Sequence, residues 1–170
     1  MNVKIIDLKS KTEVDAKIID GKKFQLPSIQ EGWRFNFQKH SKDKSANTFV
    51  LITVESPESI EGCLIYKMRN EIEPYMAYIE IAPHNKGDSK KYDEVAGCLI
   101  AYACRLSFLL GKEDYKGWLA FDVQESDKKD EQKLMTIYSK KYNARQFEQT
   151  TTMLISPAHG EKLIERYQGI

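Results

Sequence analysis

Residues 75–123 read YMAYIEIAPHNKGDSKKYDEVAGCLIAYACRLSFLLGKEDYKGWLAFDV, and this stretch decides the fold. Its first seven residues are mostly β-branched or aromatic and are followed by Pro83, which is typical of a strand and its end. Val95–Leu110 is a mostly apolar run with the length of a buried helix, and residues 117–123 again resemble a strand. A strand, a helix and a second strand in this order predict a right-handed crossover between two parallel strands.

The sequence before this unit predicts antiparallel strands joined by turns. Residues 2–19 alternate polar and apolar side chains, which indicates a strand or a strand pair, and Asp20-Gly21 is a turn signal. Residues 48–54 and 62–68 are two further strands with a turn around Pro57 between them. We therefore expect a hairpin-like series of strands that leads into the crossover.

A helix is predicted between the first strands and this series. Ser28 and Glu31 have the spacing of a capping box, and the helix is expected to continue through Trp33, Phe35 and Phe37 toward residue 40. The three aromatic side chains form either the core side of this helix or the lining of an acceptor pocket.

The end of the chain predicts further short elements. Gly111 and Asn143 are expected to end helices in a left-handed conformation. The remaining predictions are a charged loop at 125–130, a short amphipathic helix at 134–142, a strand at 151–155 and a helix at 157–167.

These elements predict an α+β fold with a mostly antiparallel central sheet, one parallel strand pair and helices on both faces. The parallel pair is expected to separate at its carboxyl end, where ligands bind in sheets of this type. The chain has 170 residues and no internal repeat or Pro/Gly-rich linker, so we expect one domain over residues 1–170.

Composition and charge exclude several classes of protein. The 26 Lys and Arg residues against 25 Asp and Glu residues give a net charge of +1, which argues against binding nucleic acid through bulk positive charge. The longest apolar run is too short for a membrane span and contains Arg105, so no membrane association is expected. Three cysteines are too few for a disulfide scaffold, which together with the lack of a signal peptide predicts a cytoplasmic protein.

The histidines and cysteines predict neither a metal site nor a thiol nucleophile. His40, His84 and His159 are far apart and lack ligand spacing, although His84 lies next to the expected crevice. Cys98 and Cys104 lie on the apolar helix and are expected to be small buried hydrophobic residues.

The loop before the apolar helix suits an anionic ligand. The first turn of a helix has free N–H groups and the positive end of the helix dipole, both of which favour a phosphate or pyrophosphate. Lys86, Lys90 and Lys91 precede this turn. The alternative is that these lysines only solvate a loop.

Several stretches together carry a family resemblance: YIEIAPHN (78–85), AGCLIAYACRLSFLLG (96–111), GWLAFDV (117–123) and LMTIYSKKYNARQF (134–147). In this order, and over about residues 62–147, they resemble the GNAT superfamily of acyl-CoA-dependent N-acyltransferases. The signature of that superfamily is Q/R-x-x-G-x-G/A at the start of the helix. It is matched here by Lys91, Tyr92, Asp93, Glu94, Val95 and Ala96, followed by Gly97.

The resemblance implies that acetyl-CoA is the acyl donor, and the spacing of the histidines predicts no metal. It places the pyrophosphate on residues Lys91 to Gly97, and the acyl and pantetheine end on the main chain of Ile81 and Ala82. Glu94 stands where the first glycine of the signature belongs. Its carboxylate either turns away from the pyrophosphate or lowers the affinity for the donor.

The resemblance also implies two catalytic roles. Tyr138 is at the position of the family's tyrosine, which protonates the leaving thiolate, and Asn143 replaces the glycine usual after this helix. Glu80, on the strand that lines the crevice, is the candidate general base. The alternatives are that Glu80 faces solvent and that Tyr138 only packs.

The sequence therefore predicts an N-acetyltransferase that moves an acetyl group from acetyl-CoA to a primary amine. The acceptor is a small metabolite, a protein lysine or N-terminus, or an aminoacyl-tRNA, and a homodimer is left open. The alternative is a catalytically lapsed GNAT-like domain that senses CoA or binds another protein, which Glu94 favours and Tyr138 opposes.

Overall fold

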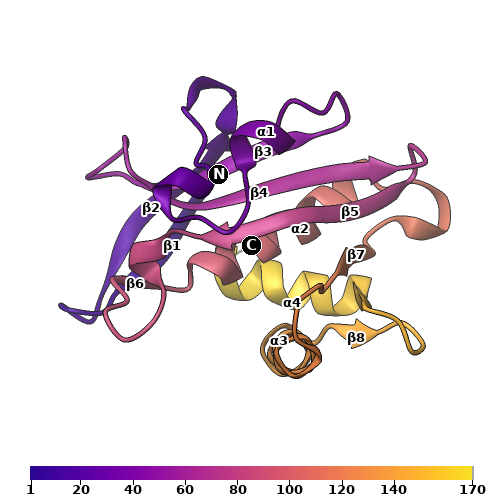
Figure 1. The fold of residues 1–170 in the computed structure, drawn as a ribbon. Helices are drawn as coiled ribbons and strands as arrows, with labels where there is room; N and C mark the ends of the chain where they lie inside the picture. The colour runs from indigo at the N-terminus through magenta and orange to yellow at the C-terminus, as the bar shows by residue number, and fades with distance from the viewer. Residues whose placement is uncertain (170) are drawn as a thin grey trace.

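A computed structural model describes residues 1–169, and the nine strands in this range form one sheet in the order β6-β1-β2-β3-β4-β5-β7-β9-β8 (Figure 1). The strands are β1 (Asn2–Asp7), β2 (Thr12–Asp20), β3 (Asn47–Thr53), β4 (Ile60–Arg69), β5 (Glu73–Ile81), β6 (Tyr92–Asp93), β7 (Leu119–Asp122), β8 (Arg145–Gln146) and β9 (Thr152–Ile155). The helices are α1 (Phe37–His40), α2 (Val95–Leu110), α3 (Lys128–Tyr142) and α4 (Pro157–Gln168).

The predicted crossover is confirmed. Strands β5 and β7 pair in parallel, and the chain between them contains α2. The other strand pairs recorded for residues 1–169 are antiparallel, including the series β2, β3, β4 and β5. The α+β fold with one parallel pair is therefore as the sequence predicted.

The two faces of the sheet are covered differently. Helices α2 and α4 pack on one face, where Leu64, Leu99 and Phe121 belong to the larger core (Figure 1). The N-terminal turns and α1 cover part of the other face, where Trp33 and Phe37 belong to a second, smaller core. These two layers bury the strands that position the candidate site.

A β-bulge in β5 opens the sheet. Ile65 of β4 pairs with Tyr78, but the next residue of β4 pairs with Met76, so that Ala77 is the extra residue of the bulge. Bulges bend a strand and increase its twist. The pairing recorded between β5 and β7 is limited to Tyr75 and Ala120, immediately before the bulge. Beyond this point the two strands diverge.

The predicted N-terminal helix is wrong beyond its first turn. The capping box is present, with the Ser28 N–H donating to Glu31 Oε2 at 2.6 Å. It starts only a single 3-10 turn at Ile29–Glu31, because Gly32 follows in a left-handed conformation at φ 84°. The chain becomes helical again only in α1, where four residues make one turn.

Other boundaries also differ from the predictions. Helix α3 begins at Lys128 rather than at 134, because Asp127 caps it by accepting from the Lys129 N–H at 2.7 Å. The left-handed conformation of Asn143 is confirmed at φ 55°, whereas Gly111 is extended at φ −60°. The two-residue strands β6 and β8 were not predicted, since so short a stretch has no periodicity to detect.

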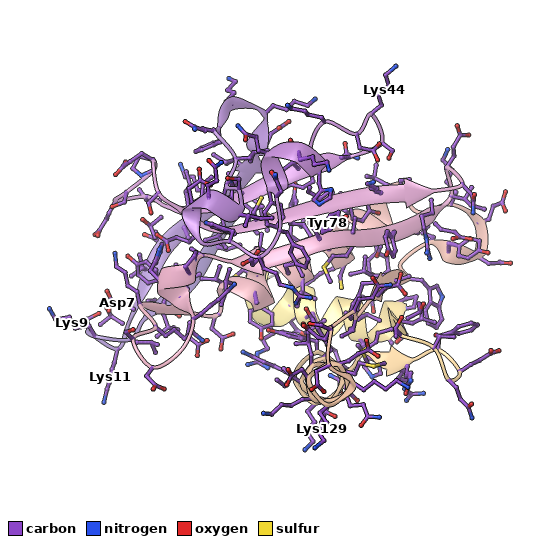
Figure 2. All side chains as sticks on the ribbon, viewed as in Figure 1. Asp7, Lys9, Lys11, Lys44, Tyr78 and Lys129 are labelled. Atoms are coloured by element: carbon purple, nitrogen blue, oxygen red, sulfur yellow. The ribbon has the colours of Figure 1, made fainter. Side chains whose placement is uncertain are left out.

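The side chains agree with the composition. Charged groups such as Lys9, Lys11, Lys44 and Lys129 project outward, whereas Tyr78 lies on the sheet beside α1 (Figure 2). The cysteines are free and buried. Burial raises the pKa of Cys98 and of Cys104 to about 12, which opposes a nucleophilic role. Among the helices of residues 1–169, none has the length and apolar character needed to span a membrane.

The contact between α2 and α4 predicts a matched pair of glycine variants. A Cβ at Gly97 would lie 2.2 Å from the ring of Tyr167, whereas a Cβ at Gly160 would meet Cys104 at an ordinary 3.4 Å. Gly97→Ala should lower the free energy of unfolding by about 1–3 kcal/mol through overpacking. Gly160→Ala, in the interior of α4, should raise it by up to about 1 kcal/mol through helix propensity. Urea denaturation measures both, and equal effects of the two variants would contradict this packing.

Candidate functional site

The diverging strands enclose a narrow crevice with a cavity of about 90 Å³. It lies directly beyond the last pairing of β5 with β7, and α3 closes one side of it. The residues that line it are Arg34, Phe35, Met76–Ile79, Phe121–Glu125, Leu134 and Tyr138. Of the three N-terminal aromatic residues, Phe35 reaches this crevice, whereas Trp33 and Phe37 belong to the core.

Arg34 connects the two sides of the crevice. Its main-chain N–H donates to Glu80 Oε2 on β5 at 2.9 Å. Its guanidinium donates to the main-chain oxygen of Gln124 at 2.7 Å and forms an ion pair with Glu125, just after β7. One residue from the N-terminal segment therefore connects β5 and the end of β7 beyond the point where the two strands pair.

Glu80 is buried, so the alternative that it faces solvent is wrong. Its side chain belongs to a residue that is only 7% exposed. Oε1 accepts from the Phe35 N–H at 3.0 Å, and Oε2 accepts from the Arg34 N–H and from Lys86 Nζ at 2.5 Å. The carboxylate thus anchors the N-terminal segment on β5, and Oε1 keeps one lone pair for another donor.

Tyr138 is in the crevice. It is on α3, and its ring packs against Phe121 of β7 with 4.8 Å between ring centroids. Burial raises the pKa of Tyr138 to about 12, while the positive charge of Arg34 acts in the opposite direction. The hydroxyl therefore stays protonated at neutral pH, which is the state that a proton donor requires.

The backbone at Glu94 has a conformation that favours glycine. Its φ is 70°, in the left-handed region, directly before the first residue of α2. Residues other than glycine pay a steric penalty in this region. Glu94 therefore occupies a position where glycine would have no steric penalty.

The side chain of Glu94 turns toward α4. It makes no capping hydrogen bond to α2, and its Oε1 lies 3.7 Å from Arg166 Nη2. Its Oε2 is buried without a hydrogen-bond partner among residues 1–169. Of the two alternatives for this residue, the structure therefore has the side chain directed away from the first turn of α2.

Asp93 places a carboxylate at the start of α2. Its Oδ1 accepts from the Glu94 N–H at 2.8 Å and from Lys90 Nζ at 2.6 Å. Burial opposes ionisation, but these two hydrogen bonds, helped by the charges of Lys90 and Lys141, lower the pKa of Asp93. The position that suits a phosphate is thus partly used by an anion of the chain itself.

The three lysines before α2 do not converge on one point. Lys86 pairs with Glu80, Lys90 pairs with Asp93, and Lys91 lies 4.8 Å from the centroid of the Tyr92 ring. The three lysines that precede the helix therefore each have a separate partner, on β5 for Lys86 and in β6 for Lys90 and Lys91.

A buried network shapes the loop that leads to α2. Asn85 has no exposed surface, accepts from the Tyr92 N–H at 3.0 Å and donates to Glu61 Oε2 at 2.8 Å. His84 Nε2 lies 2.5 Å from the same carboxylate oxygen. This network fixes the loop so that Tyr92 and Asp93 pair with β1 as β6.

The small residues of the signature have different roles. Gly97 faces the ring of Tyr167 on α4, so its lack of a side chain serves helix packing. Val95 is buried beneath Gly62 of β4, and a Cβ added at Gly62 would lie 2.8 Å from Val95 Cγ1. The main-chain N–H groups of Val95, Ala96 and Gly97 belong to the first turn, which has no acceptors within the helix for them.

Ile81 and Ala82 are not equivalent. The Ala82 N–H donates to the Glu61 oxygen at 2.9 Å, and its own oxygen accepts from the Asn85 N–H at 2.8 Å. Neighbouring residues of a strand direct their main-chain groups to opposite sides. Ile81 therefore directs its groups toward the open side of β5, whereas those of Ala82 are already used.

Solved structures match this arrangement over most of the chain. A chain of the KacTA–DNA complex matches with a TM-score of 0.61 and 11% identity, over 89% of this chain and 99% of that one. A chain of AtaTR bound with AcCoA matches with a TM-score of 0.57 and 12% identity, over 88% and 98%. The AtaT–AtaR complex bound to DNA gives 0.58 and 14%, over 88% and 98%.

The chain has the GNAT fold. At these identities the likeness concerns the fold alone. No family model and no curated protein sequence matches the chain.

Sequence reasoning missed several residues in this crevice and near the start of α2. Arg34 and Asp122 line the crevice, and Lys141 acts on the charge of Asp93. The contacts of Arg34 join residues about ninety positions apart, so no local pattern indicates them. Within residues 1–169 we find no group of three or more His, Cys, Asp or Glu side chains suited to a metal ion.

The left-handed backbone of Glu94 predicts that glycine stabilises the protein. Glu94→Gly should raise the free energy of unfolding by about 1 kcal/mol, because it removes the steric penalty at φ 70°. Glu113, at φ 53° beyond the other end of α2, is a matched control that should give a similar gain as Glu113→Gly. Chemical denaturation measures both. A loss of stability in Glu94→Gly alone would contradict this expectation. It would mean that the contact of the Glu94 carboxylate with Arg166 of α4 stabilises the protein by more than the steric penalty at φ 70° destabilises it.

Proposed function

We propose that the protein is an N-acetyltransferase that transfers the acetyl group of acetyl-CoA to a primary amine. The observation that carries this proposal is the position of Tyr138 in the crevice where β5 and β7 diverge. The match to a GNAT-fold chain described as bound with AcCoA adds support for this donor.

The donor would be held by main-chain groups at two places. The first-turn N–H groups of α2 suit the pyrophosphate, within the segment Lys91 to Gly97. The open side of β5 at Ile81 suits the amide groups of the pantetheine. The crevice of about 90 Å³ is smaller than this arm, so we expect the Arg34 guanidinium to leave Gln124 and Glu125 when the donor enters.

Each catalytic candidate has a role in the proposed proton transfers. The amine loses a proton and attacks the thioester carbonyl carbon, and the carbon–sulfur bond then breaks. Tyr138 gives its proton to the departing thiolate and recovers one from solvent. Glu80 is the proposed acceptor of the amine proton, through water, at the lone pair that Oε1 keeps.

A second function is favoured by one specific observation. Asp93 already uses the Glu94 N–H and Lys90, which are groups that a pyrophosphate needs. A GNAT-fold domain with this competition inside its phosphate loop suits a CoA sensor or a protein-interaction module without catalysis. Binding without turnover would favour this alternative.

We also expect the protein to work in the cytoplasm, because its cysteines are free thiols. The acceptor classes considered for the sequence remain the same. A homodimer is compatible with this function but is not needed for the crevice, since a single chain lines it.

Donor binding is the first prediction of this proposal. Acetyl-CoA at about one hundred times its Kd should stabilise the protein by about 2.7 kcal/mol, which thermal shift detects. Glu94→Gly should leave the affinity for acetyl-CoA unchanged, because the Glu94 side chain is directed away from the first turn of α2 toward Arg166, and Glu113→Gly should leave it unchanged as well. Absence of a shift at millimolar acetyl-CoA would reject the enzyme and the sensor alike.

Tyr138→Phe is the second prediction. Loss of the proton donor should lower kcat by about 10²–10⁴-fold and leave the Kd for acetyl-CoA unchanged. Tyr142, one turn further along α3 and outside the crevice lining, is the matched control, and Tyr142→Phe should keep kcat. Because the pKa of Tyr138 is raised to about 12, its ionisation should not reduce kcat between pH 7 and about 10. Unchanged kcat in Tyr138→Phe would remove this residue from the mechanism.

A further inference from the structure

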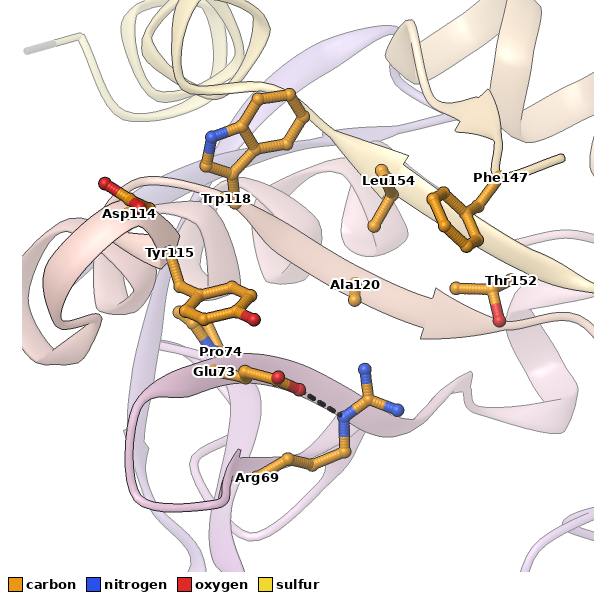
Figure 3. Close-up of a pocket in the computed structure, with 10 residues that line it drawn as sticks. All are labelled: Arg69, Glu73, Pro74, Asp114, Tyr115, Trp118, Ala120, Phe147, Thr152 and Leu154. Carbon is orange, nitrogen blue, oxygen red and sulfur yellow. Dashed lines mark ion pairs between the residues drawn. The ribbon is translucent and has the colours of Figure 1, made fainter.

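A second and larger cavity lies on the open face of the sheet. It has a volume of about 470 Å³ and is formed by the starts of β5 and β7, by β9 and by the segment before β7 (Figure 3). Tyr115, Trp118 and Phe147 line it and are 40%, 39% and 49% exposed. We call this cavity the aromatic groove.

The aromatic groove lies on the face opposite α2. Leu119 and Phe121 of β7 point into the core beneath α2, whereas Ala120, between them, lines the groove. The same alternation on β9 places Met153 in the core and Thr152 in the groove. The groove thus lies on the face of the sheet that α2 and the loop before it do not cover.

Asp122 joins the aromatic groove to the crevice. It lines the crevice, and its Oδ1 accepts from the Thr152 hydroxyl of the groove at 2.6 Å. Its Oδ2 accepts from the Tyr75 hydroxyl at 2.7 Å. Each oxygen therefore has one donor and keeps a lone pair for another. Thr152 lines the groove and contacts Asp122 of the crevice, so this hydrogen bond lies where the two cavities approach each other.

The charges of the aromatic groove favour a cation. Glu73 and Asp114 line it together with one basic residue, Arg69. The Arg69 guanidinium pairs with Glu73 at 3.6 Å and stacks on Tyr75 at 4.2 Å from the ring centroid, so its charge is already compensated. The same ion pair compensates Glu73, so Asp114 is the lining carboxylate without an ion pair among residues 1–169. Aromatic faces and such a carboxylate attract organic ammonium groups, while apolar walls take up a carbon skeleton.

We propose that the aromatic groove is the acceptor subsite and that it takes a primary ammonium carried on an aromatic or aliphatic carbon skeleton. The skeleton lies against Trp118 and Phe147, and the ammonium contacts Asp122 at the crevice. This inference rests on the proposed function, because it takes the crevice as the site of the donor thioester. Acceptors with a phosphate or carboxylate next to the amine are disfavoured by the same carboxylates.

The two tryptophans of the chain provide a direct test. Trp118 lines the groove, whereas Trp33 is 6% exposed in the core beside α1. A ¹⁵N-labelled protein has one indole N–H signal from each, and Trp118→Phe assigns them. Titration with phenethylamine hydrochloride should shift the Trp118 signal and leave that of Trp33 in place. Phenethyl alcohol, its uncharged analogue, should bind about tenfold more weakly.

Asp122→Asn tests the contact with the ammonium. It should weaken phenethylamine about tenfold and leave the alcohol unchanged, whereas Asp15→Asn, on the exposed part of β2, should change neither. Should Asp122→Asn unfold, Asp114→Asn on the exposed rim tests the same charge selection and should also weaken the amine. Equal affinities for amine and alcohol in the native protein would overturn the ligand class, and an unmoved Trp118 signal would overturn the subsite.

Acetyl-CoA binding separates this inference from the proposed function. The same samples are titrated with acetyl-CoA, read from the main-chain N–H signals of Val95 to Gly97. Amine binding without acetyl-CoA binding would reject the donor site while the groove remains a cation site. Acetyl-CoA binding without amine binding would reject the groove while the proposed function stands.

Discussion

The candidate site depends on the single place where the sheet is forced open. The bulge at Ala77 bends β5 away from β7 immediately after their pairing at Tyr75 and Ala120. Main-chain N–H and C=O groups on the open side of β5 then have no strand partner, and such groups rarely remain unpaired when buried. An extended amide-bearing ligand satisfies them as a strand does, which is why this opening suits a pantetheine arm.

The N-terminal segment is hydrogen-bonded across this opening. Glu80 receives the N–H groups of Arg34 and Phe35, and the Arg34 guanidinium reaches Gln124 beyond β7. These hydrogen bonds span the same gap that the donor would enter. Breaking hydrogen bonds to a charged group costs about 1.5–3 kcal/mol each when no new partner replaces them. The affinity for the proposed donor would therefore be lower by whatever part of this contact is not recovered after the donor binds.

Local patterns predicted the elements that local forces determine. Helix α2 runs over Val95–Leu110 as expected, because its apolar run and crossover position leave few alternatives. The N-terminal helix failed because Gly32 adopts a left-handed conformation after a genuine capping box. Tyr138 lies in the crevice, and the contacts of Arg34 with Glu125 and of Asp122 with Tyr75 join distant segments. Such contacts follow from the three-dimensional fold, which no periodicity reveals.

At the start of α2, as in the chain as a whole, positive and negative charges compensate each other. Asp93 accepts from the Glu94 N–H and from Lys90, so the loop carries an anion where a pyrophosphate would bind. A bound pyrophosphate must exchange with this carboxylate, and Lys90 then changes partner rather than gaining one. The exchange replaces one anion by another at the same donors, so its free energy depends on the small difference between the two. The affinity for the proposed donor would then depend on the main chain of β5 as much as on the loop before α2. The bulge at Ala77 is what exposes that main chain.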